Sequence, residues 1–198
     1  LAEFESTMRI GSNPSDNLVK DVFLGLLDIY FQRVPDAQKI FKLMKDRGER
    51  IKNDHVAFRS ADIRSLLRVL LPLGYDAQFD DDDSFALMNF PDKHLSALWL
   101  KHPNNDMPRI FISECRYEDI PGLSDLVDPY LSSREDRSHA VDVTDASEIV
   151  RYLHTKQFPD IADDEYNRIQ DKSEYMAWLI NNHFYLNHFT LTVNNLSS

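Results

Sequence analysis

The residues from His55 to Arg59 combine two side chains that can do chemistry with the alternation of a β-strand. In a strand, successive side chains point to opposite faces, so His55, Ala57 and Arg59 would share one face. The Cα atoms of His55 and Arg59 would then lie roughly 13 Å apart. Histidine binds metals, and arginine binds carboxylates through two parallel hydrogen bonds. The segment therefore predicts a site that holds a molecule of several carbons at both ends.

A second segment of the same design begins at His188. Its alternation would place polar side chains on one face and apolar ones toward the core: His188, Thr190 and Thr192 against Phe189, Leu191 and Val193. If both segments belong to one curved sheet, His55 and His188 can meet although they are far apart in sequence. We therefore predict a metal site with His55 and His188 as ligands and with Arg59 placed to bind an anionic substrate.

Each of these residues also has a purely structural interpretation. A single histidine on a strand is more often a hydrogen-bonded core or rim residue than a metal ligand. Arg59 could pair with a carboxylate close to it in the sequence, either Asp54 or Asp62. Two similar histidine segments favour the metal site, but their spacing alone does not prove that the histidines meet.

The elements that must position these side chains follow from periodicity, capping residues and turn residues. Helices are predicted over residues 16–33, 35–48, 63–71, 123–131, 146–155 and 164–182. Strands are predicted over residues 51–59, 75–79, 85–90, 95–101, 109–114 and 184–193. The order from residue 51 to residue 101 is strand, helix, strand, strand, strand, and the mixture indicates an α+β protein. The acidic run from Asp80 to Asp83 is interpreted as a solvated turn in preference to a cation site.

Composition limits the class of protein. The chain has 198 residues and 42% hydrophobic content, which suits a single domain: a leader or disordered segment over 1–15, N-terminal helices over 16–48 and a metal-binding core over 51–193. The net charge of -11 argues against nucleic acid and acidic membranes as partners. No apolar stretch approaches the roughly 20 residues of a membrane helix. The single cysteine, Cys115, excludes an intramolecular disulfide and favours a reducing, cytoplasmic setting.

Four segments of the chain occur together, in this order, in a known family: Asn53-Asp54-His55-Val56-Ala57-Phe58-Arg59, Phe111-Ile112-Ser113-Glu114, Glu174-Tyr175-Met176-Ala177-Trp178 and Asn187-His188-Phe189-Thr190. In these segments the chain resembles the 2-oxoadipate dioxygenase/decarboxylases. That family is similar in fold to the vicinal oxygen chelate enzymes, which wrap βαβββ units around a metal. The resemblance implies a vicinal-oxygen-chelate-like α+β fold, with a curved βαβββ sheet as an open barrel and with N-terminal and inserted helices.

The resemblance also implies an activity. His55 and His188 would be ligands of Fe(II), with Zn or Mn as alternative metals, and Arg59 would bind the carboxylate of a 2-oxo acid. The reaction would convert a 2-oxo dicarboxylic acid, 2-oxoadipate, and O2 into 2-hydroxyglutarate and CO2. The family's third ligand is a glutamate well beyond the Asn-His-Phe-Thr motif, whereas this sequence ends at Ser198. Either the chain is truncated or another carboxylate serves, for which Glu114 is the first candidate, although Glu114 could equally pair with an arginine.

Two other functions stay open at this point. The chain could be a catalytically incomplete module that binds a small acid through Arg59. It could also be a metal-dependent hydrolase or isomerase on the same fold, which would not need oxygen. Oxygen consumption separates both alternatives from the dioxygenase.

Overall fold

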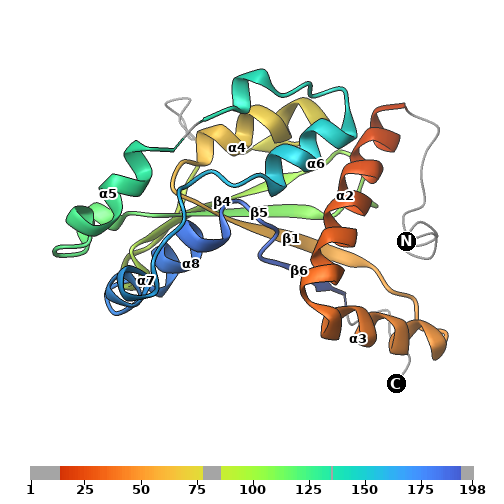
Figure 1. Cartoon of the computed structure of the whole chain (residues 1–198). Coiled ribbons are helices and arrows are strands. Elements are labelled where there is room, and N and C mark those ends of the chain that lie inside the picture. The colour runs from red at the N-terminus through yellow and green to blue at the C-terminus, as the bar shows by residue number, and fades with distance from the viewer. Residues whose placement is uncertain (1–13, 78–85, 135, 193–198) are drawn as a thin grey trace.

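The structure is a computed structural model that describes residues 14–77, 86–134 and 136–192 (Figure 1). The strands form a mixed sheet in the order β2-β4-β5-β1-β6, with β3 also paired to β4. Their bounds are β1 Asn53–Ser60, β2 Asp76–Ala77, β3 Met88–Phe90, β4 Leu95–Lys101, β5 Arg109–Cys115 and β6 His188–Leu191. The sheet is open, because its two edges do not pair with each other, and this agrees with the fold expected from the sequence.

The strand-helix-strand-strand-strand order predicted from residue 51 to residue 101 is confirmed as β1, α4, β2, β3 and β4, although β3 lies off the main path of the sheet. Strands β2 and β3 are both antiparallel to β4 and pair with different parts of it, so together they act as one interrupted edge strand. Strand β5 then completes the unit, because it pairs antiparallel with β4 and parallel with β1. Strand β6 adds to the other edge of β1 in the antiparallel direction. This last pairing brings the two histidine segments side by side.

The helices lie where the sequence predicts them, with small shifts at their ends and one exception. Their bounds are α2 Pro14–Arg33, α3 Pro35–Asp46, α4 Ile63–Leu70, α5 Ser124–Ser132, α6 Ala146–His154, α7 Asp163–Gln170 and α8 Glu174–Asn182. The exception is the helix predicted over 164–182, which is wrong because the chain forms α7 and α8 instead. The break occurs at Ser173, whose side chain accepts a hydrogen bond from the backbone N–H of Met176 and so caps a new helix.

The last strand is also shorter than the predicted span of 184–193. Phe184 is fully buried in the core, and the backbone of His183 has φ 58°, a left-handed conformation that turns the chain before the sheet begins. Among the described residues of the predicted span, those that pair as a strand are His188–Leu191. The predicted acidic turn over 80–83 and Val193 lie outside the described residues. So do residues 1–13 of the leader or disordered segment predicted over 1–15, whereas Pro14 and Ser15 belong to α2.

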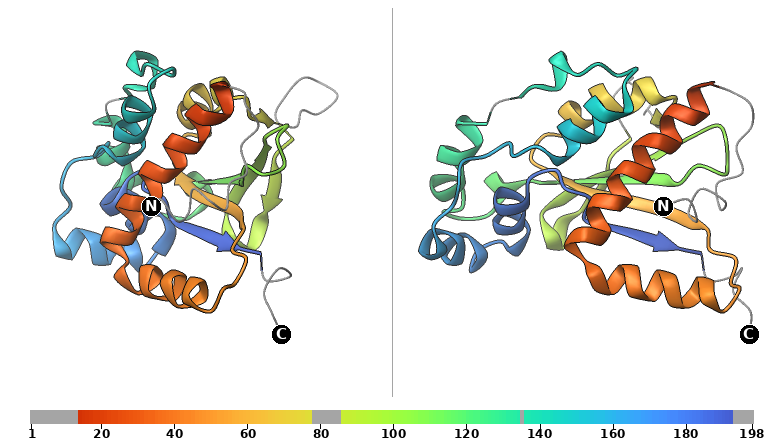
Figure 2. Two further views of the ribbon diagram at one scale, coloured as in Figure 1. Left: turned by 90° about the vertical axis from the view of Figure 1, so that its right-hand side faces the viewer. Right: turned by 45° about the vertical axis from the view of Figure 1, so that its right-hand side comes forward.

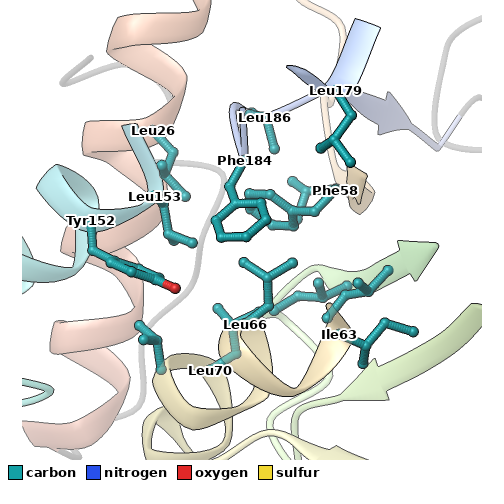
Figure 3. Packing of buried hydrophobic residues seen from close by; sticks show 14 of the residues in the cluster. Leu26, Phe58, Ile63, Leu66, Leu70, Tyr152, Leu153, Leu179, Phe184 and Leu186 are labelled. Atoms are coloured by element: carbon teal, nitrogen blue, oxygen red, sulfur yellow. The ribbon is translucent and has the colours of Figure 1, made fainter. Parts of the chain in front are cut away.

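The core fills the space between the sheet and helices α2, α4 and α6, which lie on one side of it (Figures 1 and 2). Figure 3 shows Phe58 of β1 among side chains from these helices and from the segment before β6, including Leu66, Leu153 and Phe184. The alternation of β1 therefore directs Phe58 into the core and leaves His55 on the opposite face. Gly25 lets α2 approach α6, because a Cβ at this position would lie 2.9 Å from a methyl carbon of Val150.

The same core covers one face of the sheet and connects the helices to it.

No helix in the described ranges has both the length and the apolar character needed to cross a membrane. The division of the chain into a single domain stays a prediction.

Candidate metal centre

The register of β1 against β6 places the two predicted histidines on one face of the sheet. Thr190 lies opposite His55, and His188 lies opposite Ala57, so His55 and His188 are diagonal neighbours. The centroids of their rings are 5.7 Å apart, and the ring planes meet at 79°. The structure thus brings together two imidazoles from distant parts of the sequence.

Each histidine is oriented by a hydrogen bond from Nδ1. The Nδ1–H of His55 donates to Oδ2 of Asp54 at 2.8 Å, and the Nδ1–H of His188 donates to Oδ1 of Asn187 at 2.8 Å. These bonds select the tautomer whose Nε2 carries a lone pair. Such second-sphere oxygens orient histidine ligands in most metal sites and make them better donors. The arrangement therefore presents one Nε2 from each ring for coordination.

Asp54 was considered in the sequence only as a partner of Arg59, and its role beside His55 was missed. Neighbouring residues of a regular strand point to opposite faces, but the pairing of β1 with β6 shifts register between Asn53 and His55. A bulge of this kind re-aims side chains and allows Asp54 to reach the ring of the next residue. The hydrogen bond from His55, with a further one from Arg109, lowers the pKa of Asp54. Asp54 is therefore ionised at neutral pH.

The two histidines have different surroundings. Thr190 lies within hydrogen-bond distance of Nε2 of His55, at 3.1 Å, where its hydroxyl can donate. The edge of the His55 ring contacts Trp99, with centroids 5.1 Å apart. His188 is exposed as a residue, but partial burial of its ring lowers its pKa, and the nearby His55 and Arg59 lower it further. Both effects favour the neutral imidazole, which is the form that binds a metal.

Arg59 is not used in either of the ion pairs considered from the sequence. Asp54 binds Arg109 through both oxygens, at 2.7 and 2.8 Å, and Asp62 binds Arg134 at 3.1 Å. Within the part of the chain that the structure describes, the guanidinium of Arg59 has no carboxylate partner. The structure thus leaves a cation beside His188 whose charge is not neutralised by another side chain.

Two aromatic rings from α8 hold Arg59 in place. The guanidinium carbon lies 5.0 Å from the ring centre of Tyr175 and 4.8 Å from that of Trp178. Residues three apart on a helix share a face, so one turn of α8 supplies both contacts. Cation–π contacts position a guanidinium without occupying its N–H groups with an acceptor oxygen. Arg59 can therefore still bind a carboxylate in the forked geometry.

Tyr175 also joins β1 to β5 at the end of the sheet near Arg59. Its hydroxyl accepts a hydrogen bond from the backbone N–H of Ser60 at 3.0 Å and donates one to the carbonyl of Ser113 at 2.6 Å. Burial raises the pKa of this hydroxyl well above its usual value, so Tyr175 stays protonated. Tyr175 and Trp178 were not singled out as site residues from the sequence. Their spacing on α8 is a signal, but it becomes informative only when α8 is known to pack near Arg59.

The wall beside the histidines is apolar. Ala57 pairs with Phe111 of β5, and Phe111 pairs in turn with Trp99 of β4, with ring centroids 4.7 Å apart. Arg109 also contacts Trp99, with its guanidinium carbon 5.2 Å from the ring centre. A wall of this kind keeps water from one side of the histidine pair and strengthens electrostatic interactions there.

Glu114 does not lie with the histidines. It pairs with Ser60 in the parallel register of β1 and β5, and Ser60 is on the face opposite to Arg59. One Glu114 carboxylate oxygen accepts a hydrogen bond from the backbone N–H of Ile63 at 2.6 Å, at the start of α4. Burial raises the pKa of Glu114. The structure thus gives Glu114 a role in holding α4 to the sheet, and this geometry does not support it as the third metal ligand.

The candidate metal donors that the described residues bring together are two histidines. Among the described residues, no group of three or more His, Cys, Asp or Glu side chains is placed to hold a metal ion. The two Nε2 atoms with their second-sphere oxygens nevertheless fit a metal, because an ion about 2.0–2.1 Å from each nitrogen can lie between rings at this separation.

Comparisons of the chain with a family model and with curated proteins point to the same family. A family model described as 2-oxoadipate dioxygenase/decarboxylase matches residues 22–198. Over 202 aligned residues the chain is 29% identical to the 2-oxoadipate dioxygenase/decarboxylase, chloroplastic/amyloplastic, of Oryza sativa subsp. japonica, an alignment that covers 93% of this chain and 52% of that protein. It is 25% identical to the chloroplastic Arabidopsis thaliana protein of the same name, and covers 51% of it. The chain thus spans about half the length of the curated relatives it matches.

Solved structures agree on the fold. The hydroxyglutarate synthase of Oryza sativa, determined in complex with 2-oxoadipate, superposes with a TM-score of 0.76 at 25% identity and covers 96% of this chain and 62% of that chain. A protein assigned to the glyoxalase superfamily from Ralstonia eutropha JMP134 superposes with a TM-score of 0.73 at 17% identity and covers 89% of this chain and 62% of that chain. The predicted vicinal-oxygen-chelate-like fold is therefore confirmed.

Proposed function

Because the chain belongs to the 2-oxoadipate dioxygenase/decarboxylase family, we propose that it binds a 2-oxo dicarboxylic acid and, with Fe(II) and O2, converts it into a 2-hydroxy acid and CO2. The substrate proposed is 2-oxoadipate, which is bound in the related rice structure, and the product is 2-hydroxyglutarate. The observation that carries the proposal is the pair of oriented histidines with an unneutralised Arg59 beside them on one face.

His55 and His188 are proposed as two ligands of the metal, each through Nε2. Two histidines and one carboxylate on Fe(II) leave coordination positions free for a chelating 2-oxo acid and for O2, which is the chemistry that the metal would supply. Zn and Mn are the alternative metals. The third ligand is assigned to none of the described residues.

The protein's own side chains orient the substrate. Arg59 binds a carboxylate of the acid through two N–H groups, and Tyr175 and Trp178 fix the plane of its guanidinium. Asp54 and Asn187 keep Nε2 of both histidines unprotonated. Trp99 keeps water from the side of His55. A carbon chain between Arg59 and the histidines is thus held at one end while the other end approaches the metal.

The test is oxygen consumption by protein that has been purified anaerobically and loaded with one equivalent of Fe(II). The atoms balance with no other reactant, so one O2 consumed should give one CO2 and one 2-hydroxyglutarate from each 2-oxoadipate. His55→Ala should lose both the metal and the oxygen uptake. His139→Ala is the matched control, because His139 is exposed on a short turn away from the sheet. Full uptake by His55→Ala would contradict the proposal.

A second candidate function is a binding module for small 2-oxo acids that does not turn them over. The observation that favours it is the absence of a third protein ligand among the described residues. In that case 2-oxoadipate should bind in a manner that depends on Arg59, and no oxygen should be consumed at any iron content. A hydrolase or isomerase would likewise consume no oxygen but would change the acid.

The location of the protein in the cell is a proposal as well. Cys115 is buried and unpaired in the part of the chain described, and burial raises the pKa of its thiol to about 11, so its thiolate is not readily formed. A cytoplasmic location stays a prediction, and the names of the rice and Arabidopsis relatives carry the term chloroplastic for those proteins.

A further inference from the structure

A cavity of about 280 Å³ lies between α2, α6, α8 and the segment before β6. Its apolar wall includes Leu26, Leu153 and Leu186, which Figure 3 shows on the side of the sheet that Phe58 faces. His55 and Arg59 project from the opposite face of β1, so this cavity is separate from the candidate metal centre. Trp178 and Asn187 line the cavity and also contact Arg59 and His188 of that centre.

Arg33, the last residue of α2, provides a positive charge at the rim of the cavity. Its guanidinium lies over the ring of Tyr185, 3.9 Å from the ring centre, and donates a hydrogen bond to Oδ1 of Asn182 at 3.2 Å. No carboxylate pairs with Arg33 in the described ranges. Stacking and one amide contact hold the guanidinium still and leave other N–H groups unused. Such a preorganised arginine is suited to bind a carboxylate.

The titratable neighbours of Arg33 do not neutralise it. His154 stacks on Tyr185 with ring centroids 4.6 Å apart, and its pKa is lowered by desolvation and by the charge of Arg33. Burial, with the charges of Lys156 and Arg33, lowers the pKa of His183 to about 4. Both histidines are therefore neutral at pH 7. The nearby carboxylate of Asp160 is paired with Lys156. The local field thus stays positive in a protein whose net charge is -11.

We propose that this cavity binds a small amphipathic carboxylic acid. The carboxylate pairs with Arg33, and the apolar body lies between Leu26, Leu153 and Trp178. The volume of about 280 Å³ lies just below the usual range for small-molecule sites, about 300–1,000 Å³, so the body is a single ring or a short branched chain. The site goes beyond the proposed function, since it needs neither the metal nor oxygen. Its ligand would contact Trp178 and Asn187, which hold Arg59 and His188.

The probe for this site is phenylacetate, and the neutral isostere phenylacetamide is its control. Binding is measured on the metal-free 198-residue chain by calorimetric titration, with ¹⁵N amide shifts to locate it. Phenylacetate should bind with saturation and shift the amides of Asn182 and Tyr185, and phenylacetamide should bind about tenfold or more weakly, because the charge-assisted hydrogen bonds are lost. Equal binding of the two probes, or no saturable binding of phenylacetate, would overturn the proposal.

Two variants test the role of Arg33 in different ways. Arg33→Gln removes the charge, whereas Asn182→Asp places an internal carboxylate beside Arg33 and should fill the anion position. Each substitution should weaken phenylacetate binding about tenfold or more. Asn182→Asp therefore still tests the proposal if Arg33→Gln fails to fold. Arg47→Gln removes an exposed arginine at the end of α3 and should change nothing.

Arg59→Ala separates this cavity from the metal centre. It should leave phenylacetate binding unchanged, because Arg59 does not line the cavity. If Arg59→Ala abolishes binding while Arg33→Gln does not, the probe occupies the metal centre and the inference is wrong. A failure of oxygen uptake with 2-oxoadipate has no bearing on this result, so the two proposals fail separately.

Discussion

At the scale of single residues, the acceptor beside Nδ1 determines what Nε2 of each histidine can do. Asp54 and Asn187 both accept a hydrogen bond at 2.8 Å, but only Asp54 is charged, and Arg109 holds it in place. His55 is therefore the ring with the stronger second-sphere partner. A carboxylate partner raises the basicity of the ligating nitrogen more than an amide does.

Replacing the charged partner should weaken metal binding. Asp54→Asn keeps the size of the side chain but removes the charge that orients His55. We expect metal affinity to fall about tenfold or more, within the 10–100-fold range for second-sphere changes. Competition titrations with Co(II), or with Fe(II) under anaerobic conditions, measure it. Asp106→Asn is the control, since Asp106 is exposed and pairs only loosely with Lys52 at 3.9 Å. Unchanged affinity in Asp54→Asn would remove Asp54 from the site.

Arg59 should matter for the acid and not for the metal. Arg59→Ala should weaken 2-oxoadipate binding by about tenfold or more, the loss expected for hydrogen bonds between charged groups. Arg59→Lys should recover little, because an ammonium group cannot form the planar fork or stack between two rings. Calorimetric titration of the acid and of the metal, with Arg47→Ala for comparison, separates the two effects. Equal loss of acid and metal binding would count against the assignment.

At the scale of elements, helix α8 connects the site to the sheet. Ser173 starts this helix, Tyr175 joins β1 to β5, and Trp178 reaches both Arg59 and the cavity near Arg33. A single turn of helix therefore controls the position of the Arg59 guanidinium, which would bind the substrate carboxylate, and the spacing of two parallel strands. Because the chain breaks between α7 and α8, helix α8 starts at its own N-cap, Ser173, and need not continue in the direction of α7.

Removal of the Tyr175 hydroxyl should cost stability and substrate affinity together. Tyr175→Phe leaves the N–H of Ser60 and the carbonyl of Ser113 without their partner, which should lower the free energy of unfolding by about 1–3 kcal/mol. Urea unfolding measures this loss. Tyr166→Phe on α7, which removes a hydroxyl without such contacts, should stay within about 0.5 kcal/mol. A purely structural role predicts unchanged 2-oxoadipate affinity in the folded variant, whereas a positioning role predicts weaker binding.

At the scale of the whole molecule, His183 links the helical layer to the segment that leads into β6. Its Nδ1 accepts hydrogen bonds from the backbone N–H groups of Gln157 and Phe158, at 3.0 and 3.2 Å, so this nitrogen carries no proton. The ring is buried and stacks on Phe158. Burial of the ring, with the charges of Lys156 and Arg33, lowers the pKa of His183 to about 4. Protonation would also break both hydrogen bonds.

This burial makes stability dependent on pH in a defined window. The folded pKa of His183 is about 4 and the ordinary value is 6.5, so the unfolded chain binds the proton first as the pH falls. Stability is then lost between about pH 6.5 and pH 4. At pH 5 the contribution of His183 should be about 2 kcal/mol below that at pH 7.

The measurement is urea unfolding at pH 7 and pH 5. His183→Asn keeps an acceptor oxygen and removes the titrating ring, so it should lose about 2 kcal/mol less stability between the two pH values than the wild type. His139→Asn at an exposed position should keep the full pH dependence. An identical decrease in His183→Asn and in the wild type would show that other groups cause it.

The sequence by itself determined the faces of β1 and β6 and the places of most helices. Period two and period 3.6 arise from local backbone geometry, so alternation was enough to align His55 with Arg59 and to set Phe58 against them. The family motifs added the expectation of iron and a 2-oxo acid.

Only the tertiary structure decided which groups surround the histidines. The face of Glu114 depends on the parallel register of β5 with β1, the reach of Asp54 depends on a register shift against β6, and the stacking of Arg59 depends on where α8 packs. Register and packing arise from contacts between segments far apart in the chain, and no local pattern encodes them. For this reason the shared face of His55, His188 and Arg59 could be predicted, while the residues that orient them could not, and the roles of the three as ligands stay predictions.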